Sequence, residues 1–263
     1  MPRADDSRHI RLEGCLNLRD LGGYPTRDGG EVRTGCVYRS SDLCALTDGD
    51  VETVTSLGIA VVVDLRGHHE RLARPNRLPH GVEVHERTSP STRTDPARTL
   101  EDRIASRSFP DRDDDLLTAS YLGHLEEHLT SELRTILELA VDSPRRPLVF
   151  HCAAGKDRTG IAAAVLLGVL GVGDDDIVAD YELSTSHWAV PRLAALARHL
   201  DRHGVTADEV RHLVEPRTEV LRRVIDHVHG RWGGFESYAV ECLGLRPSLP
   251  RRLRSALVAH TGG

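Results

Sequence analysis

The stretch PLVFHCAAGKDRTGIAAAVLLGVLG, residues 147–171, joins two apolar runs through a short polar loop. PLVF is typical of a strand that is buried on both faces, and TGIAAAVLLGVLG is typical of a largely apolar helix. A strand that leads through a loop into a helix is one unit of an α/β sheet. The loop HCAAGKDRTG therefore lies beside the carboxyl ends of the strands, where α/β proteins bind ligands.

Five residues separate Cys152 from Arg158 in this loop. A loop between a strand and a helix turns successive amide N–H groups inward, at the positive end of the helix dipole, so it forms a cup for one phosphate-sized anion. Helix N-termini and nearby cations favour the thiolate form of cysteine, so we expect Cys152 to be a nucleophile. Arg158 can grip two oxygens of the anion at once. Gly155 allows the tight turn, and Thr159 can hydrogen-bond the sulfur.

Other interpretations of the loop fit less well. A nucleotide-binding P-loop needs Gly at position 150 and Ser or Thr at position 157, where this chain has Phe150 and Asp157. A structural buried cysteine leaves the glycines, the arginine and the threonine unexplained. A rhodanese-type sulfur transferase also carries a cysteine in such a loop, but the Thr-Gly pair after the arginine disfavours it.

Composition limits the class of protein. The chain has 263 residues, a net charge of −6 and 39% hydrophobic residues, which suits one globular domain, residues 1–263, and argues against a nucleic-acid partner. The longest apolar run, 161–172, is too short to span a bilayer, and the first residues have no apolar core of a signal peptide. Five cysteines without a CxxC pair suggest reduced thiols and a cytoplasmic location. The oligomeric state stays open.

The rest of the chain predicts an α/β fold, with a central, mostly parallel sheet flanked by helices and a C-terminal helical elaboration. Strands are expected at VYR (37–39), IAVVVDL (59–65), VEVHE (82–86) and PLVF. Helices are expected over 47–58, with Thr47 as N-cap, over 116–141, and through 174–257, with breaks at Pro191, Gly204, Pro216, Gly230 and Pro247. The polar segment 88–115 predicts a flap, and 187–217 a helical lid.

The loop resembles the signature H-C-x5-R-[ST] of cysteine-dependent protein tyrosine and dual-specificity phosphatases. It is closer still to the bacterial subgroup with H-C-x-x-G-K-D-R-[ST]-G, which includes lipid-phosphatase-like enzymes. Four further stretches resemble that subgroup: NLRDLGGY (17–24), VYRSSDL (37–43), VVVDLRGHHE (61–70) and GGFESYAVECLGL (233–245). The likeness thus covers nearly the whole chain.

This resemblance implies a two-step hydrolysis of phosphomonoesters without metal or cofactor. Cys152 attacks phosphorus, an acid protonates the leaving oxygen, and water then hydrolyses the phosphocysteine. The substrate-binding residues that it implies are Ala153, Ala154, Gly155, Lys156 and Thr159. Lys156, the sole lysine of the chain, would touch substrate phosphate, as in inositol-lipid phosphatases. The alanines at 153 and 154 lack the extra cation that some lipid phosphatases place there.

Two aspartates compete as the general acid. The subgroup resemblance favours Asp157, whereas Asp64 ends a predicted strand beside the site. Asp64 can instead pair with Arg66 and orient the loop, and we prefer that interpretation. Arg39 ends another strand in a similar place, and His151 is expected to support the loop rather than act as a base.

Three alternatives remain open. The stretch HLEEH (124–128) matches an inverted zinc-protease pattern, but its histidines are expected to face solvent and no third ligand follows. The substrate can be a phosphorylated protein, favoured here, or a small phosphomonoester or phosphoinositide. A catalytically idle phospho-binding module is the alternative from another class.

Overall fold

A five-stranded sheet with parallel central strands forms the middle of the molecule. The computed structural model describes residues 6–87, 99–142 and 147–260. The strand order is β1 (Arg19–Asp20), β3 (Val37–Ser40), β6 (Leu148–His151), β4 (Val61–Asp64) and β5 (Glu83–Glu86), and only β1 is antiparallel to its neighbour. A separate two-stranded pairing joins β2 (Glu31–Val32) to β7 (Val258–Ala259). The predicted α/β class with a mostly parallel sheet is confirmed.

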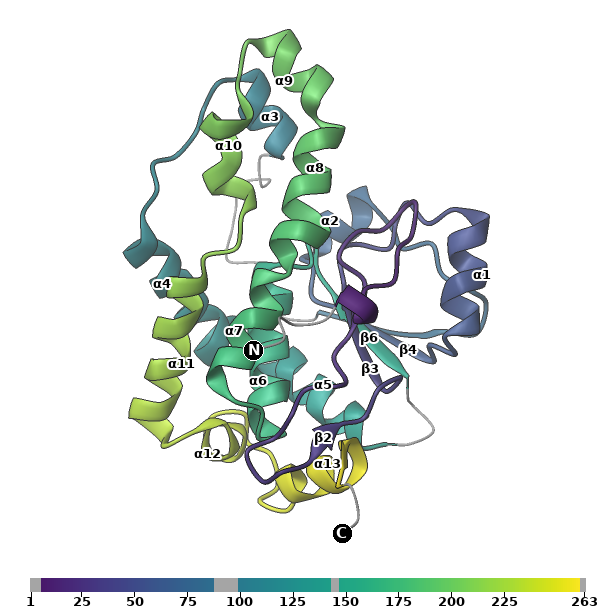
Figure 1. Cartoon of the computed structure of the whole chain (residues 1–263), viewed down its shortest axis with the longest axis vertical. Coiled ribbons are helices and arrows are strands. Elements are labelled where there is room, and N and C mark those ends of the chain that lie inside the picture. Colours follow the sequence, from purple (N-terminus) through teal and green to yellow (C-terminus); the bar gives the residue numbers. More distant parts are fainter. Residues whose placement is uncertain (1–5, 88–98, 143–146, 261–263) are drawn as a thin grey trace.

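Helices account for most of the remaining described chain (Figure 1). They are α1 (Asp48–Ser56), α2 (His68–Ala73), α3 (Leu100–Ala105), α4 (Asp114–Gly123), α5 (Thr130–Val141), α6 (Asp157–Val169), α7 (Asp174–Glu182), α8 (Val190–Ala195), α9 (Ala197–His203), α10 (Ala207–Val214), α11 (Thr218–Trp232), α12 (Phe235–Glu241) and α13 (Leu249–Leu257), with short turns η1 (Asp6–Arg8), η2 (His124–His128) and η4 (Thr185–Ala189).

The alternation of side chains along the strands divides the sheet core into two clusters. Val61 and Val63 of β4 face the larger cluster, which the helices α5, α6, α7 and α11 complete. Val62 faces the smaller cluster on the other side, against α1. Successive strand residues point to opposite faces, and both faces are covered, which is why this strand is a continuous apolar run.

The helix expected after Thr47 forms as predicted, because Thr47 and Asp50 make a capping box. Three other expectations need correction. The helix over 116–141 is divided into α4, η2 and α5. Pro191 lies in the first turn of α8, where a missing N–H costs nothing, and Gly230 lies inside α11, so neither ends a helix.

A third apolar cluster lies apart from the sheet, at the top of Figure 1. Buried side chains of α8, α9 and α10 pack around Ile104 of α3, so the C-terminal part of the predicted flap meets the predicted lid in one small core. Residues 88–98 of the flap lie outside the described residues. Lys156 joins this cluster to the site, as set out below.

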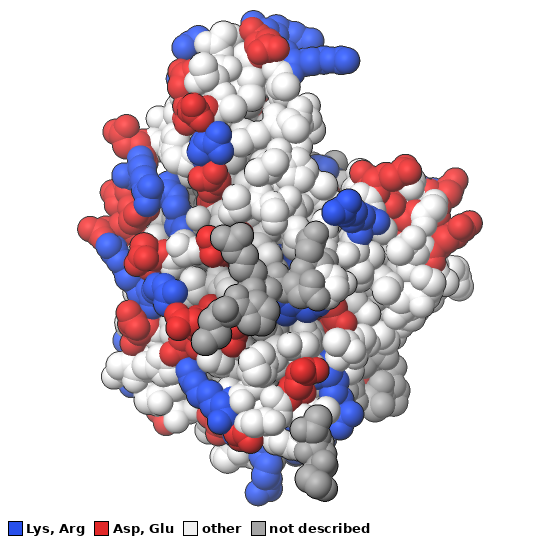
Figure 2. All heavy atoms as spheres, viewed as in Figure 1, with Lys and Arg blue, Asp and Glu red and all other residues white. Residues whose placement is uncertain are grey.

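Charges of both signs are interspersed along the edge formed by α4 and α11 (Figure 2). Several are paired across elements, such as Arg223 with Asp115 at 2.6 Å and Arg222 with Asp175 at 2.9 Å. In the part of the chain that the structure describes, no helix has the length and apolar character needed to cross a membrane.

Candidate active site

The carbonyl groups of the loop between β6 and α6 accept hydrogen bonds from residues outside the loop. The amide of Asp42, the side chain of Asn17 and the guanidinium of Arg39 donate to the carbonyls of residues 153–155, at 3.2 Å, 2.9–3.3 Å and 2.8 Å. Among the described residues, no hydrogen bond engages the amides of residues 153–157. Holding the carbonyls on one side leaves these amides free to bind an anion on the other.

Two glycines of the loop are required by close contacts. Gly155 has φ +65°, and a Cβ there would lie 2.3 Å from the carbonyl oxygen of Ser40. A Cβ on Gly160 would lie 2.7 Å from the ring of Tyr181. The first glycine therefore allows the loop to pass against β3, and the second allows α6 to pack against α7.

Cys152 lies at the floor of the loop, 3% exposed. Arg158 is held beside it by Glu70, which accepts two hydrogen bonds from the guanidinium, at 2.7 and 2.8 Å, and by the carbonyl of Leu65 at 3.1 Å. Burial alone would raise the pKa of Glu70, but the hydrogen bonds and charge of Arg158 outweigh it and hold that pKa below its usual range. The arginine is therefore fixed in orientation before any substrate arrives.

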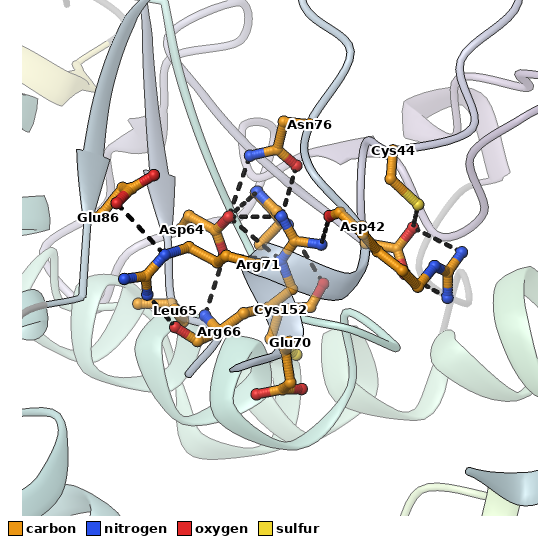
Figure 3. Close-up of polar contacts among 12 residues, drawn as sticks. Asp42, Cys44, Asp64, Leu65, Arg66, Glu70, Arg71, Asn76, Glu86 and Cys152 are labelled. Atoms are coloured by element: carbon orange, nitrogen blue, oxygen red, sulfur yellow. Dashed lines mark hydrogen bonds and ion pairs between the residues drawn. The ribbon is translucent and has the colours of Figure 1, made fainter. Parts of the chain in front are cut away.

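Asp64 forms a buried pair with Arg66, as the preferred interpretation of the sequence holds. Arg66 Nη2 lies 2.6 Å from Asp64 Oδ2, and Asn76 Nδ2 donates to the same oxygen at 3.0 Å (Figure 3). Burial favours the neutral acid, but the hydrogen bonds and the charge of Arg66 outweigh it and lower the pKa of Asp64 to about 2. A carboxyl group with this pKa has no proton to donate near neutral pH.

His151 is buried beside the loop. Its Nδ1 lies 3.2 Å from the carbonyl oxygen of Cys152, and its Nε2 lies 3.6 Å from Asp64 Oδ2. Burial lowers the pKa of His151, so the ring is neutral. Thr159 differs from expectation, because its buried hydroxyl makes no hydrogen bond, to the sulfur or to any other described group.

Asp157 is the first residue of α6, and its carboxylate meets two tyrosines. The hydroxyl of Tyr121 donates to Oδ1, and the hydroxyl of Tyr181 lies 3.5 Å from the same oxygen. Lys156 Nζ is 3.7 Å from the other oxygen, Oδ2. Asp157 therefore has neutral hydroxyl donors at Oδ1 and one cation near Oδ2, whereas Asp64 is fully buried and paired with a guanidinium.

Lys156 has partners that the sequence did not suggest. Its ammonium lies 3.2–3.4 Å from the carbonyls of residues 213–215, at the C-terminal end of α10, and it is 6% exposed. An ammonium has three donors, and a helix C-terminus carries carbonyls without partners within the helix. Lys156 therefore connects the loop to the predicted lid.

We expect Lys156→Met to loosen α10, because the substitution keeps the apolar stem but removes the cation from the helix terminus. Amide hydrogen exchange over residues 207–215 should rise several-fold. Arg254→Met is the matched control, since Arg254 donates to the carbonyl of Val169 at the C-terminal end of α6, at 3.1 Å, and contacts neither the loop nor α10. Unchanged exchange, together with a raised KM for multiply phosphorylated substrates, would instead assign the ammonium to the substrate.

Several residues of the site were missed from the sequence. A buried carboxylate, Asp180 of α7, binds Arg19 at 3.0 Å and Arg39 at 2.5 Å, and thereby fixes the arginine that supports the loop. Asn17 reaches the loop from a left-handed backbone conformation, φ +64°. Glu70 and Asn17 stood inside stretches that resemble the family, whereas Tyr121 and Asp180 lie in helices where nothing local distinguished them.

The HLEEH stretch is the turn η2, and its first histidine does not face solvent as expected. His124 is half-buried, and burial, with Arg158 and Arg87 nearby, lowers its pKa to about 4. Glu126 is occupied by His227 at 2.6 Å. Over the described ranges, no three histidine, cysteine or acidic side chains are grouped closely enough to hold a metal ion.

A buried thiol beneath free amides, with a clamped guanidinium beside it, is the arrangement of a cysteine-dependent phosphatase. The comparison with known sequences agrees. A sequence model described as "Tyrosine phosphatase family" matches residues 10–259, and the chain belongs to that family. The family and enzyme class predicted from the sequence are thus confirmed.

Two relatives align over most of the chain. A Cupriavidus necator protein, described as a candidate tyrosine-protein phosphatase, is 32% identical over 90% of this chain and 85% of its own length. The triple specificity protein phosphatase PtpB of Mycobacterium tuberculosis is 29% identical over 94% of this chain and 98% of its own length. Among solved structures, P. aeruginosa TpbA is 18% identical, covers 70% of this chain and 89% of its own, and has a TM-score of 0.33.

Proposed function

We propose that this protein hydrolyses phosphomonoesters through a phosphocysteine intermediate, with phosphotyrosine in proteins as the favoured substrate. The observation that carries the proposal is the loop itself. The amides of residues 153–157 have no hydrogen-bond partner among the described residues, the carbonyls of residues 153–155 accept hydrogen bonds from outside the loop, and Cys152 is buried at its floor. Such a preorganised set of donors stabilises the charge that develops on the phosphoryl group in the transition state.

In the first step, the Cys152 thiolate forms a bond to phosphorus while the bond to the leaving oxygen breaks. The phosphoryl oxygens are held by the amides of residues 153–157 and by Arg158, which Glu70 keeps in place. Asp157 gives its proton to the leaving oxygen. The loop is supported by His151, Asp64, Arg66 and Arg39, none of which needs to touch the substrate.

In the second step, water attacks phosphorus and the bond to sulfur breaks. Asp157, now a carboxylate, takes a proton from the attacking water, and the thiolate is regenerated with release of inorganic phosphate. The protons balance over the two steps, since the one lost to the leaving group is recovered from water.

Turnover of para-nitrophenyl phosphate tests this proposal. We expect activity without added metal, unchanged by a chelator and lost on treatment with peroxide, because a thiolate is oxidised more readily than a thiol. Inhibition by the chelator would contradict this metal-independent mechanism and favour a metal site at the HLEEH turn. Phosphate binding without any turnover would identify the idle phospho-binding module instead.

Two observations support a phosphoprotein substrate over a phosphoinositide. Ala153 and Ala154 supply no cation to the cup, and Lys156 is engaged by α10. The relatives' names refer to tyrosine-protein and triple specificity protein phosphatases. A panel of phosphotyrosine and phosphoserine peptides, inositides and sugar phosphates, compared by kcat/KM, distinguishes these classes. A kcat/KM for an inositide that exceeds every peptide would overturn this choice.

We also propose a single phosphatase domain over residues 1–263, with the α8–α10 region as a lid. Support comes from the separate apolar cluster of α3 and α8–α10 and from its contact with Lys156. A cytoplasmic location is supported by five cysteines that are all free. Fractionation of the native cells tests the location.

A further inference from the structure

A chain of hydroxyl groups ends at the carboxylate of Asp157. The backbone N–H of Arg217, just before α11, donates to the hydroxyl oxygen of Tyr181 at 3.2 Å. The hydroxyls of Tyr181 and Tyr121 are 2.8 Å apart, and that of Tyr121 donates to Asp157 Oδ1. Both tyrosines are only 1% exposed, so water does not compete for these bonds.

The backbone N–H of Arg217 sets the direction in which these hydroxyl groups donate their hydrogen bonds. A backbone N–H can only donate, so the hydroxyl of Tyr181 accepts there and turns its own hydrogen toward Tyr121 or Asp157. Tyr121, which makes the closer contact, then donates to Oδ1. Burial, with the nearby Asp157 charge, raises the pKa of both hydroxyls, so each keeps the hydrogen that it must donate.

We propose that Tyr121 and Tyr181 are positioning residues that keep Oδ1 of Asp157 as a permanent acceptor, so that Oδ2 carries the catalytic proton. This inference rests on the proposed function of Asp157 as the acid. Oδ2 loses its proton to the leaving oxygen in the first step and regains one from water in the second. The hydrogen bonds to Oδ1 stay in place throughout, so the carboxyl group need not rotate between steps.

Other charged or titratable groups also face Asp157. Lys156 lies 3.7 Å from Oδ2, Arg158 follows Asp157 in the chain, and His124 approaches from η2. Arg158 is permanently charged, and His124, with a pKa lowered to about 4 by burial, is neutral above that pH. Removing the hydroxyl of Tyr121 leaves these groups in place, so its effect can be measured separately.

The test compares pH profiles of kcat for wild type and Tyr121→Phe, with an aryl and an alkyl phosphate. A donor to Oδ1 stabilises the carboxylate over the acid, so its loss favours the protonated form. The basic limb of the profile should therefore move upward by about one pH unit. The alkyl phosphate should lose roughly tenfold more kcat than the aryl phosphate, since only its leaving group needs the well-placed proton. Tyr181→Phe should shift the limb in the same direction by less.

Tyr238→Phe is the matched control, because Tyr238 is also fully buried and donates one hydrogen bond, to the carbonyl of Leu125 at 2.6 Å. Its pH profile should coincide with that of wild type. A Tyr121→Phe profile that coincides with wild type, or an equal loss for both substrates without a shift, would overturn the inference. Should that variant not fold, Tyr181→Phe decides by the same criteria.

Failure of this inference differs from failure of the proposed function. The proposed function fails if wild type has no turnover, or if Cys152→Ser retains it. The inference alone fails if wild type turns over and Asp157→Asn shows the leaving-group dependence, while the tyrosine variants show no shift of the basic limb.

Discussion

Cys152→Ser is expected to abolish turnover, with kcat reduced by at least about four orders of magnitude. A serine hydroxyl is not ionised near neutral pH, and no described base hydrogen-bonds position 152 to activate it. The amides of residues 153–157 and the Arg158–Glu70 pair do not depend on the sulfur. The variant should therefore still bind vanadate or inorganic phosphate.

The two readouts of this variant separate chemistry from binding. Single-turnover assays with para-nitrophenyl phosphate measure the rate of the chemical step, and isothermal titration with vanadate measures the affinity of the loop for an anion. Cys242→Ser is a matched control, because Cys242 is also a free cysteine but lies at the end of α12, in another part of the fold. Activity that persists in Cys152→Ser would refute the phosphocysteine mechanism.

Asp157→Asn is expected to lower kcat by about 10²- to 10⁴-fold for alkyl phosphates, the range typical of general acid catalysis. An aryl leaving group of low basicity departs with little protonation, so its kcat should fall much less. The amide of asparagine can still accept a hydrogen bond from Tyr121, so the fold should be retained. The measurement is kcat against leaving-group basicity across a series of phosphate esters.

For Asp64→Asn, we expect a loss of kcat that does not depend on the basicity of the leaving group. Asp64 is paired with Arg66 and hydrogen-bonded by Asn76, so its loss leaves a buried guanidinium without a counter-charge. Removing one partner of a buried pair typically costs about 3–5 kcal/mol of stability. All esters should suffer about equally, and the Tm should fall. A leaving-group dependence in Asp64→Asn but not in Asp157→Asn would exchange the two roles.

The sheet and the loop were predictable because their signals are local. The apolar runs that became β4 and β6, the capping box of Thr47 and the spacing from Cys152 to Arg158 all lie within a few residues of the feature that they specify. The choice between Asp157 and Asp64 as the acid rested on the family resemblance and stays a prediction; the structure adds that Asp64 is paired with Arg66.

The support of the loop was not predictable in the same way. Asp180 contacts Arg39 across 141 residues of sequence, and Tyr121 reaches Asp157 across 36, so no spacing rule relates them. Lys156 was unusual in composition, yet its partners are carbonyls of α10, which any residue supplies. Backbone partners leave no trace in the sequence.

The pair of arginines around Asp180 has a consequence for proton linkage. Burial favours the neutral acid, but the charges of Arg19 and Arg39 outweigh it and hold the pKa of Asp180 far below the value of about 3.9 for an unfolded chain. A depressed pKa stabilises the fold at every pH above the unfolded value, and that stabilisation is lost only as pH falls toward the folded value. Mild acid therefore leaves Asp180 and its two arginines charged and paired, so a loss of activity between pH 4 and pH 6 does not arise from protonation of this carboxylate.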